Sequence, residues 1–182
     1  MYAPHFAAAL AIKSTAPRAP LWALLAGAFL PDVLWIALAR IGVEPAQSST
    51  FFDDWSHSLV SILVLASLFA VLFLRAGRAV LAAVWLAVFS HFLLDFPVHP
   101  NRLALYPLSK IYLGWDLLTW GSSQGWLGVT NYWWLQWFLL LFFLCVYVNG
   151  VRRTRAPVNV VAASCVVVMG AQLLLLSTCI SY

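Results

Sequence analysis

The chain has 182 residues, of which 64% are hydrophobic and only 9% carry a charge. A soluble domain is about 45–50% apolar and about 25% charged, so this composition excludes a soluble monomer, and its apolar and aromatic content excludes a disordered chain. The net charge of +4 is small and is spread over short clusters, so we expect no nucleic-acid partner. A polytopic membrane protein is the class that remains.

Five apolar segments follow one another along the chain. In order they are residues 20–39, 58–74, 79–94, 132–148 and 158–177. A membrane-spanning helix needs about 20 residues, with about 17 as the lower limit, so a preceding apolar piece at residues 4–12 is too brief to span alone. The sequence therefore predicts an all-α fold. We expect a polytopic transmembrane bundle of about five spanning helices plus a short N-terminal helix, in a single domain of residues 1–182.

The first apolar segment contains Asp32 directly after Pro31. An aspartate at the centre of a membrane helix costs at least about 2.5–3.5 kcal/mol, so Asp32 is a functional candidate. Pro31 favours a kink or break in the helix, which would make room for a cavity. The alternative is that Asp32 bonds the backbone freed at such a break.

The second apolar segment begins with His57. The preceding residues, Asp53-Asp54-Trp55-Ser56, resemble a helix start with Asp54 or Ser56 as the N-cap. His57 is either a structural histidine at this helix end or part of a site. Asp54 is either a solvated loop charge or a group that supports the site.

The third segment ends in Ser-His-Phe-Leu-Leu-Asp-Phe-Pro-Val-His, residues 90–99. His91 and Asp95 are four residues apart and share one helix face. Pro97 cannot continue the helix, so a turn after Asp95 can bring His99 back towards them. Two imidazoles and a carboxylate suit Zn²⁺, as one ion or two. Alternatively, Asp95 caps the helix or pairs with Arg102.

The basic residues predict the orientation of the chain. Seven of the ten fall in three short regions: Lys13 and Arg18 before the first segment; Arg75 and Arg78 between the second and third; Arg152, Arg153 and Arg155 between the fourth and fifth. Such regions face the cytoplasm, so residues 40–56 and 96–131 face outward. The start of the second segment and the end of the third then meet at the outer face, which places His57 near His91.

The outer region is rich in tryptophan. Its members are Trp115, Trp120, Trp126, Trp133, Trp134 and Trp137. They indicate an aromatic belt with an amphipathic segment in the membrane interface. The other interpretation is a platform on which a lipid or hydrophobic substrate approaches the site.

The polar motifs together resemble a known family. Pro4-His5, Leu30-Pro31-Asp32, Ser56-His57-Ser58 and Ser90-His91 with Asp95 occur in the order typical of the YdjM-like bacterial inner-membrane metal-dependent hydrolases. The order is also similar to that of zinc-dependent phospholipase C. The resemblance covers residues 4–110, whereas the last two spans, residues 131–178, carry no recognised motif. It implies a zinc site whose ligands are His5, Asp32, His57, His91 and Asp95, with His99 as a further candidate.

The charge pattern and the resemblance disagree about His5. The charges place the N-terminus inside, opposite the cluster, whereas the resemblance requires His5 in the site. A helical hairpin with its inner turn at residues 13–20 reconciles the two, although residues 2–16 are short for crossing most of a bilayer.

The residues and the resemblance together predict a membrane-embedded, metal-dependent hydrolase with zinc as the metal and its site near the outer face; the resemblance implies the bacterial inner membrane. The expected substrate is a lipid or a lipid-linked phosphoester or ester, with membrane lipids around it. Asp32 or Asp54 is the expected general base. Two alternatives stand beside this function: a small transporter that uses buried Asp and His residues, and a structural membrane protein with a metal site.

Overall fold

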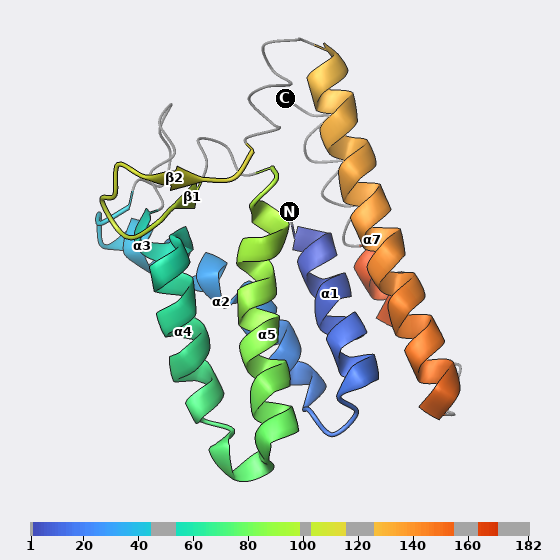
Figure 1. Ribbon diagram of the computed structural model, residues 1–182. Coiled ribbons are helices and arrows are strands. Elements are labelled where there is room, and N and C mark those ends of the chain that lie inside the picture. Colours follow the sequence, from blue (N-terminus) through green and yellow to red (C-terminus); the bar gives the residue numbers. More distant parts are fainter. Residues whose placement is uncertain (1, 45–53, 99–102, 116–125, 155–163, 171–182) are drawn as a thin grey trace.

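A computed structural model describes residues 2–44, 54–98, 103–115, 126–154 and 164–170 (Figure 1). Its helices are α1 (Tyr2–Thr15), α2 (Leu21–Arg40), α3 (Asp54–His57), α4 (Leu59–Val71), α5 (Arg78–Asp95) and α7 (Trp126–Thr154), with a 3₁₀ turn, η1 (Leu74–Ala76), before α5. Residues 164–170 are also helical. The predicted helical bundle is therefore confirmed, including the short N-terminal helix.

Within the described ranges, three helices are long and apolar enough to cross a membrane. They are α2, α5 and residues Trp134–Arg152 of α7. The second predicted span corresponds to α4, which is apolar but has only 13 residues. Most of the fifth predicted span lies outside the described residues, apart from 164–170. Three candidate spans are therefore established by length and composition.

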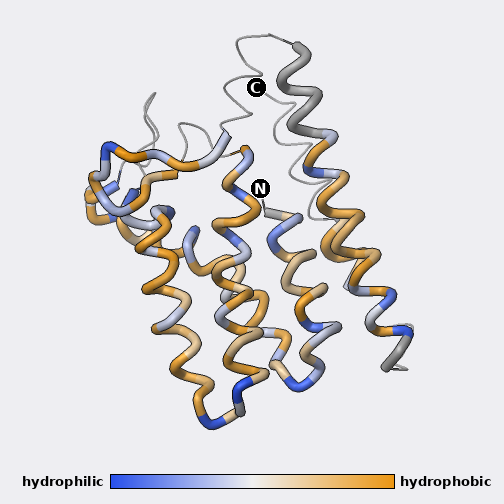
Figure 2. The backbone as a smooth tube through the Cα atoms, viewed as in Figure 1, coloured by the Kyte–Doolittle hydropathy of each residue, from blue (hydrophilic) through white to orange (hydrophobic). Residues whose placement is uncertain are grey.

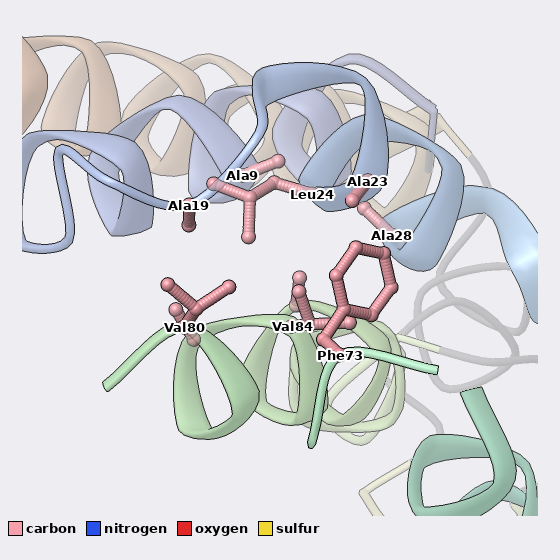
Figure 3. Close-up of a cluster of buried hydrophobic side chains, with 10 residues drawn as sticks. Ala9, Ala19, Ala23, Leu24, Ala28, Phe73, Val80 and Val84 are labelled. Atoms are coloured by element: carbon pink, nitrogen blue, oxygen red, sulfur yellow. The ribbon is translucent and has the colours of Figure 1, made fainter. Parts of the chain in front are cut away.

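Small residues bring α1, α2 and α5 close together. Ala9, Leu24 and Val84 are buried in one apolar cluster that joins these three helices (Figure 3). A Cβ added at Gly27 of α2 would lie 3.2 Å from Val88 Cγ2 of α5, so only a small residue fits there. Small residues are the usual means of close helix packing in membranes.

The other face of α1 packs on α7, although the two helices are far apart in sequence (Figure 1). Ala3 and Ala7 of α1 contact Leu140 and Leu144 of α7 within a second apolar cluster. α1 is thus enclosed between α7 on one side and α2 with α5 on the other.

Helix α2 passes through Pro31 as one continuous helix. The prediction that Pro31 interrupts the segment is therefore wrong for the secondary structure. Pro31 is buried, and the helix tolerates the lost backbone N–H because its neighbours pack around it.

The α5 helix ends at Asp95, as the proline at position 97 predicts. A two-stranded antiparallel hairpin follows, formed by β1 (Leu103–Ala104) and β2 (Tyr112–Leu113). Leu103 packs with Ile62 of α4 and Phe92 of α5. This hairpin was not expected in an all-α fold, and it covers the ends of α4 and α5 beside the polar cluster described below.

The opposite end of the bundle carries basic residues in its turns. Figure 2 shows hydrophilic positions at the α1–α2 turn, at the α4–α5 turn and near the end of α7. In the first turn, Lys13 Nζ donates hydrogen bonds to the carbonyl oxygens of Pro17 and Ala19, each at 2.7 Å. The α1–α2 connection is therefore the helical hairpin that the sequence required to bring His5 to the other end.

Candidate metal centre

Four helices bring histidine and aspartate side chains into one buried cluster. His5 comes from α1, Asp32 from α2, His57 from α3, and His91 and Asp95 from α5. The His5 ring stacks on the His91 ring with centroids 4.0 Å apart, and the His57 ring lies 5.2 Å from that of His91. The three imidazole rings therefore lie close together, and His91 contacts both of the others.

The carboxylate of Asp95 contacts the two stacked rings, one oxygen to each. Its Oδ1 is 3.2 Å from His5 Nε2, and its Oδ2 is 3.2 Å from His91 Nε2. His91 and Asp95 meet because residues four apart lie on the same face of α5. All three side chains are at most 7% exposed, so water does not solvate this group.

The carboxylate of Asp32 forms the second group. Its Oδ1 is 3.5 Å from His57 Nε2 and 3.8 Å from His91 Nε2. The Asp32 side chain is 15% exposed, compared with 7% for Asp95. Asp32 is therefore the more accessible of the two carboxylates.

The position of the hydrogen on His91 follows from its backbone contact. His91 Nδ1 lies 2.7 Å from the carbonyl oxygen of Ala28 on α2. A carbonyl only accepts hydrogen bonds, so Nδ1 carries the hydrogen and donates it. In the neutral ring, Nε2 then presents its lone pair to the carboxylates of Asp32 and Asp95.

This arrangement leaves buried nitrogen atoms unsatisfied. The close contacts to Asp95 lack hydrogen-bond geometry, and the described residues offer neither nitrogen of His5, nor Nε2 of His91, a hydrogen-bond partner. Buried polar atoms of this kind are rare in native proteins and often mark a bound ion or water. A lone pair that faces two carboxylates is repelled by them unless a positive charge, either a proton on the ring or a metal ion, lies between.

The donor atoms fit a divalent metal ion. His5, His91 and Asp95 form one group, and Asp32, His57 and His91 form another, with the ligand atoms of each group within 4.8 Å of one another. Tetrahedral zinc with bonds near 2.1 Å separates its ligand atoms by about 3.4 Å, which is close to the observed 3.2–3.8 Å. His91 belongs to both groups but has only one nitrogen that faces the cluster. That nitrogen can therefore bind a metal ion in one group or in the other, but not in both.

Five of the six predicted metal ligands thus lie in the cluster. The sixth, His99, lies outside the described residues. Asp54, a predicted general base, is buried in the first turn of α3 and belongs to neither of the two groups. The predicted N-cap is also corrected: α3 is a single separate turn, and Ser58 caps α4 by accepting a hydrogen bond from Ser61 N.

Glu44 is a residue near the site that the sequence did not single out. It was assigned only to an outward-facing loop, yet it is 1% exposed. Its Oε1 accepts hydrogen bonds from Trp55 N at 2.8 Å and Ser56 N at 3.0 Å, and its Oε2 accepts one from Ser56 Oγ at 2.9 Å. Ser56 Oγ in turn lies 2.8 Å from His57 Nδ1. No periodicity relates Glu44 to this serine, so spacing alone could not have found the contact.

Comparisons of the chain with protein-family models, with curated proteins and with solved structures found no match. The interpretation of the site therefore rests on its own geometry.

Proposed function

We propose that the protein is a membrane-embedded hydrolase that depends on a metal ion, with zinc as the metal. One observation carries the proposal: His91 Nε2 lies 3.2 Å from Asp95 and 3.8 Å from Asp32 inside a buried cluster. Two carboxylates beside an imidazole lone pair repel it, and a divalent cation removes this repulsion. Histidine nitrogen and carboxylate oxygen are zinc ligands, and they also suit other divalent transition metals.

The residues of the cluster divide between holding the ion and moving a proton. His91, His5 and Asp95 form the more deeply buried group, and His57 approaches from the other side. A bound Zn²⁺ turns water into a nucleophile at neutral pH and polarises a phosphoryl or acyl oxygen. Asp32 is the more exposed carboxylate, so we assign it the general-base role of accepting the proton at a carboxylate oxygen.

The three candidate spans support a membrane location, and we extend the proposal to five spanning helices in the bacterial inner membrane. The basic turns lie at one end of the bundle, and the ends of α1, α3 and α5 that carry the cluster lie at the other (Figure 1). The positive-inside rule then directs the cluster to the outer face. A site at that depth meets lipid headgroups, so we propose a lipid or lipid-linked phosphoester or ester as substrate.

The motif residues also support membership of the YdjM-like family of membrane metal-dependent hydrolases. His5, Asp32, His57, His91 and Asp95 stand at the positions that the resemblance assigns to metal ligands. Their convergence in space supports this proposal, because the resemblance was based on their order in the sequence alone.

A transporter is the second candidate, and one observation favours it. Asp32 lies well inside α2, which is long and apolar enough to span a membrane. Charged residues at such positions relay protons or bind cargo in transporters. Uptake into proteoliposomes that requires an ion gradient and is lost in Asp32→Asn would favour transport over hydrolysis.

The test of the proposed function begins with metal content. The wild-type protein and His91→Ala are purified in detergent, and bound zinc is measured by elemental analysis. We expect close to one zinc per wild-type chain and a loss in the variant, because His91 is common to both ligand groups. Negligible zinc in both proteins would overturn the proposal.

A matched control and an activity assay complete this test. Ser67→Ala removes a hydroxyl on the exposed side of α4 and should retain zinc, provided that both variants elute as single species with wild-type helicity. The wild-type protein should release product from phospholipids in mixed micelles, and Asp32→Asn should not. A variant that loses zinc and thermal stability but keeps its biological activity would instead identify a structural metal.

A further inference from the structure

A chain of hydrogen bonds runs from Glu44 through Ser56 to the ring of His57. We propose that Glu44 and Ser56 are positioning residues that fix the tautomer of His57, so that its Nδ1 carries the hydrogen and its Nε2 presents a lone pair to the cluster. The inference rests on the proposed metal site, because the lone pair is what a metal ion needs. It gives a role to Glu44, which no motif contains, and to Ser56, which precedes His57 in its motif but is not one of the expected ligands.

The direction of each hydrogen bond follows from the atoms involved. Glu44 accepts hydrogen bonds from the N–H groups of Trp55 and Ser56 and from the Ser56 hydroxyl, since a carboxylate only accepts. Ser56 Oγ has a single hydrogen and donates it to Glu44 Oε2 at 2.9 Å. Towards His57 Nδ1, at 2.8 Å, the same oxygen can therefore only accept. The donor in that contact has to be the Nδ1–H group of His57.

The opposite nitrogen of the ring then faces the cluster without a hydrogen. His57 Nε2 lies 3.5 Å from Asp32 Oδ1. His91 is held in the same way, because its Nδ1 donates to the carbonyl of Ala28 and its Nε2 points to the carboxylates. In both rings, Nδ1 donates a hydrogen bond to the surrounding protein and Nε2 faces the proposed metal site. This is the usual arrangement of metal-binding histidines with an outer hydrogen-bond partner.

Glu44 also holds the segment that carries His57. It follows the end of α2 and binds the first backbone N–H groups of α3, which is a helix of only four residues. A helix of one turn has little stability of its own, so its position depends on such contacts. Glu44 therefore sets both the place of the ring and the direction of its lone pair.

Glu44→Gln tests the direction of the lone pair while keeping the size of the side chain. The amide oxygen still accepts from the N–H groups of Trp55 and Ser56, so the NH₂ group takes the place of Oε2. That group donates to Ser56 Oγ, whose hydrogen then turns towards His57 Nδ1. The ring is driven to the Nε2–H tautomer, which blocks the lone pair.

Two measurements report this change. Nitrogen NMR of the imidazole rings in the metal-free protein should give the Nδ1–H tautomer for His57 in the wild type and the Nε2–H tautomer in Glu44→Gln. Zinc affinity, measured by competition with a chromophoric chelator, should fall about 10–100-fold, the range seen when outer partners of metal ligands are replaced. The absorption spectrum of the Co²⁺-loaded protein should change as well, because the coordination of His57 is altered.

A second variant and a control keep the proposal open to refutation. Ser56→Ala removes the bridging hydroxyl but leaves the backbone contacts of Glu44, so it should fold and should also lose zinc affinity. Ser58→Ala removes the neighbouring hydroxyl, which bonds Ser61 and not His57, and should keep both the tautomer and the affinity. Unchanged tautomer and affinity in Glu44→Gln and Ser56→Ala would overturn the inference.

Failure of the metal site itself would give a different result. If the wild-type protein bound no zinc or Co²⁺, the proposed function would fail, while the NMR comparison would still report whether Glu44 sets the His57 tautomer. Normal zinc binding with an Nε2–H tautomer in the metal-free wild type would refute the positioning role alone.

Discussion

Helices α1, α2 and α5 carry two buried clusters of opposite character. Towards the basic turns they meet through Ala9, Leu24 and Val84 (Figure 3). Towards the other end they meet through His and Asp side chains. On α5, Val84 and His91 are seven residues apart, which is about 10 Å along a helix. The small apolar side chains set the close spacing of the helices, and this spacing brings the polar side chains of different helices within contact distance.

The two clusters differ in what they contribute to stability. Burial of the apolar cluster favours the folded state through close packing. Burial of two carboxylates costs several kcal/mol unless they are compensated, and the described residues leave three imidazole nitrogens of the polar cluster without a hydrogen-bond partner. The proposed metal ion would compensate the buried charge of the polar cluster. Substitutions in the polar cluster should therefore change metal binding, whereas substitutions in the apolar cluster should change stability.

The largest effect should come from the metal at the polar end. A ligand at about 1,000 times its Kd stabilises the folded state by about 4 kcal/mol, so zinc should raise the thermal unfolding temperature of the detergent-solubilised protein and a chelator should reverse this. The measurement is unfolding followed by circular dichroism with and without zinc.

Asp95→Asn is the matched control for that experiment. It keeps the size of a side chain that faces both His5 and His91 but removes the charge. The variant should not respond to zinc. An equal zinc shift in wild type and variant would place the bound ion elsewhere on the chain.

The apolar end should respond in stability alone. Leu24 is fully buried, so Leu24→Ala should lower the free energy of unfolding by about 3 kcal/mol, within the range of 2–5 kcal/mol for such cavities. Leu68→Ala, on the exposed side of α4, should cost far less. Both variants should retain zinc per folded chain, as checked by elemental analysis. A loss of zinc in folded Leu24→Ala would mean that the two clusters are coupled.

The helices and most residues of the polar cluster could be predicted from the sequence for one reason. In so apolar a chain, the histidines and aspartates near Pro31, Ser56 and Ser90 stand out. The positions of His57 and His91 near segment ends place these two at the same face. The prediction failed where the outcome depended on packing. The helix continues through Pro31, and the β1–β2 hairpin forms over α4 and α5, because tertiary contacts decide both.

Contacts that are long-range and follow no period were also beyond sequence reasoning. Glu44 reaches Ser56 across a segment outside the described residues, and the Ala28 carbonyl meets His91 across 63 positions. Neither contact has a spacing signature, and a backbone carbonyl carries no residue preference at all. The place of His5 also depends on tertiary structure, because only the hairpin between α1 and α2 brings it to the cluster.

The contact between α1 and α7 should give the next largest effect, outside both clusters. A Cβ at Gly150 of α7 would collide with the Oγ and Cβ of Ser14, so Gly150→Ala should cost about 2 kcal/mol, within the usual 1–3 kcal/mol for overpacking. Gly170→Ala is the control, because no atom of the described residues lies within 4 Å of an added Cβ there. Thermal unfolding of the two variants measures the difference. Equal stability would mean that α7 does not pack on α1 at this point.

The smallest effect should come from Ser58, the fully buried serine that follows His57. Ser58 caps α4: its Oγ accepts from Ser61 N and donates to Ser61 Oγ. Loss of such a cap costs about 1 kcal/mol, so Ser58→Ala should lower the free energy of unfolding by that amount and leave zinc affinity unchanged. Titration with zinc and thermal unfolding of the same samples check both. A fall in zinc affinity in Ser58→Ala would show that any disturbance beside His57 weakens the site, and the specific role of the hydroxyl at position 56 would then be lost.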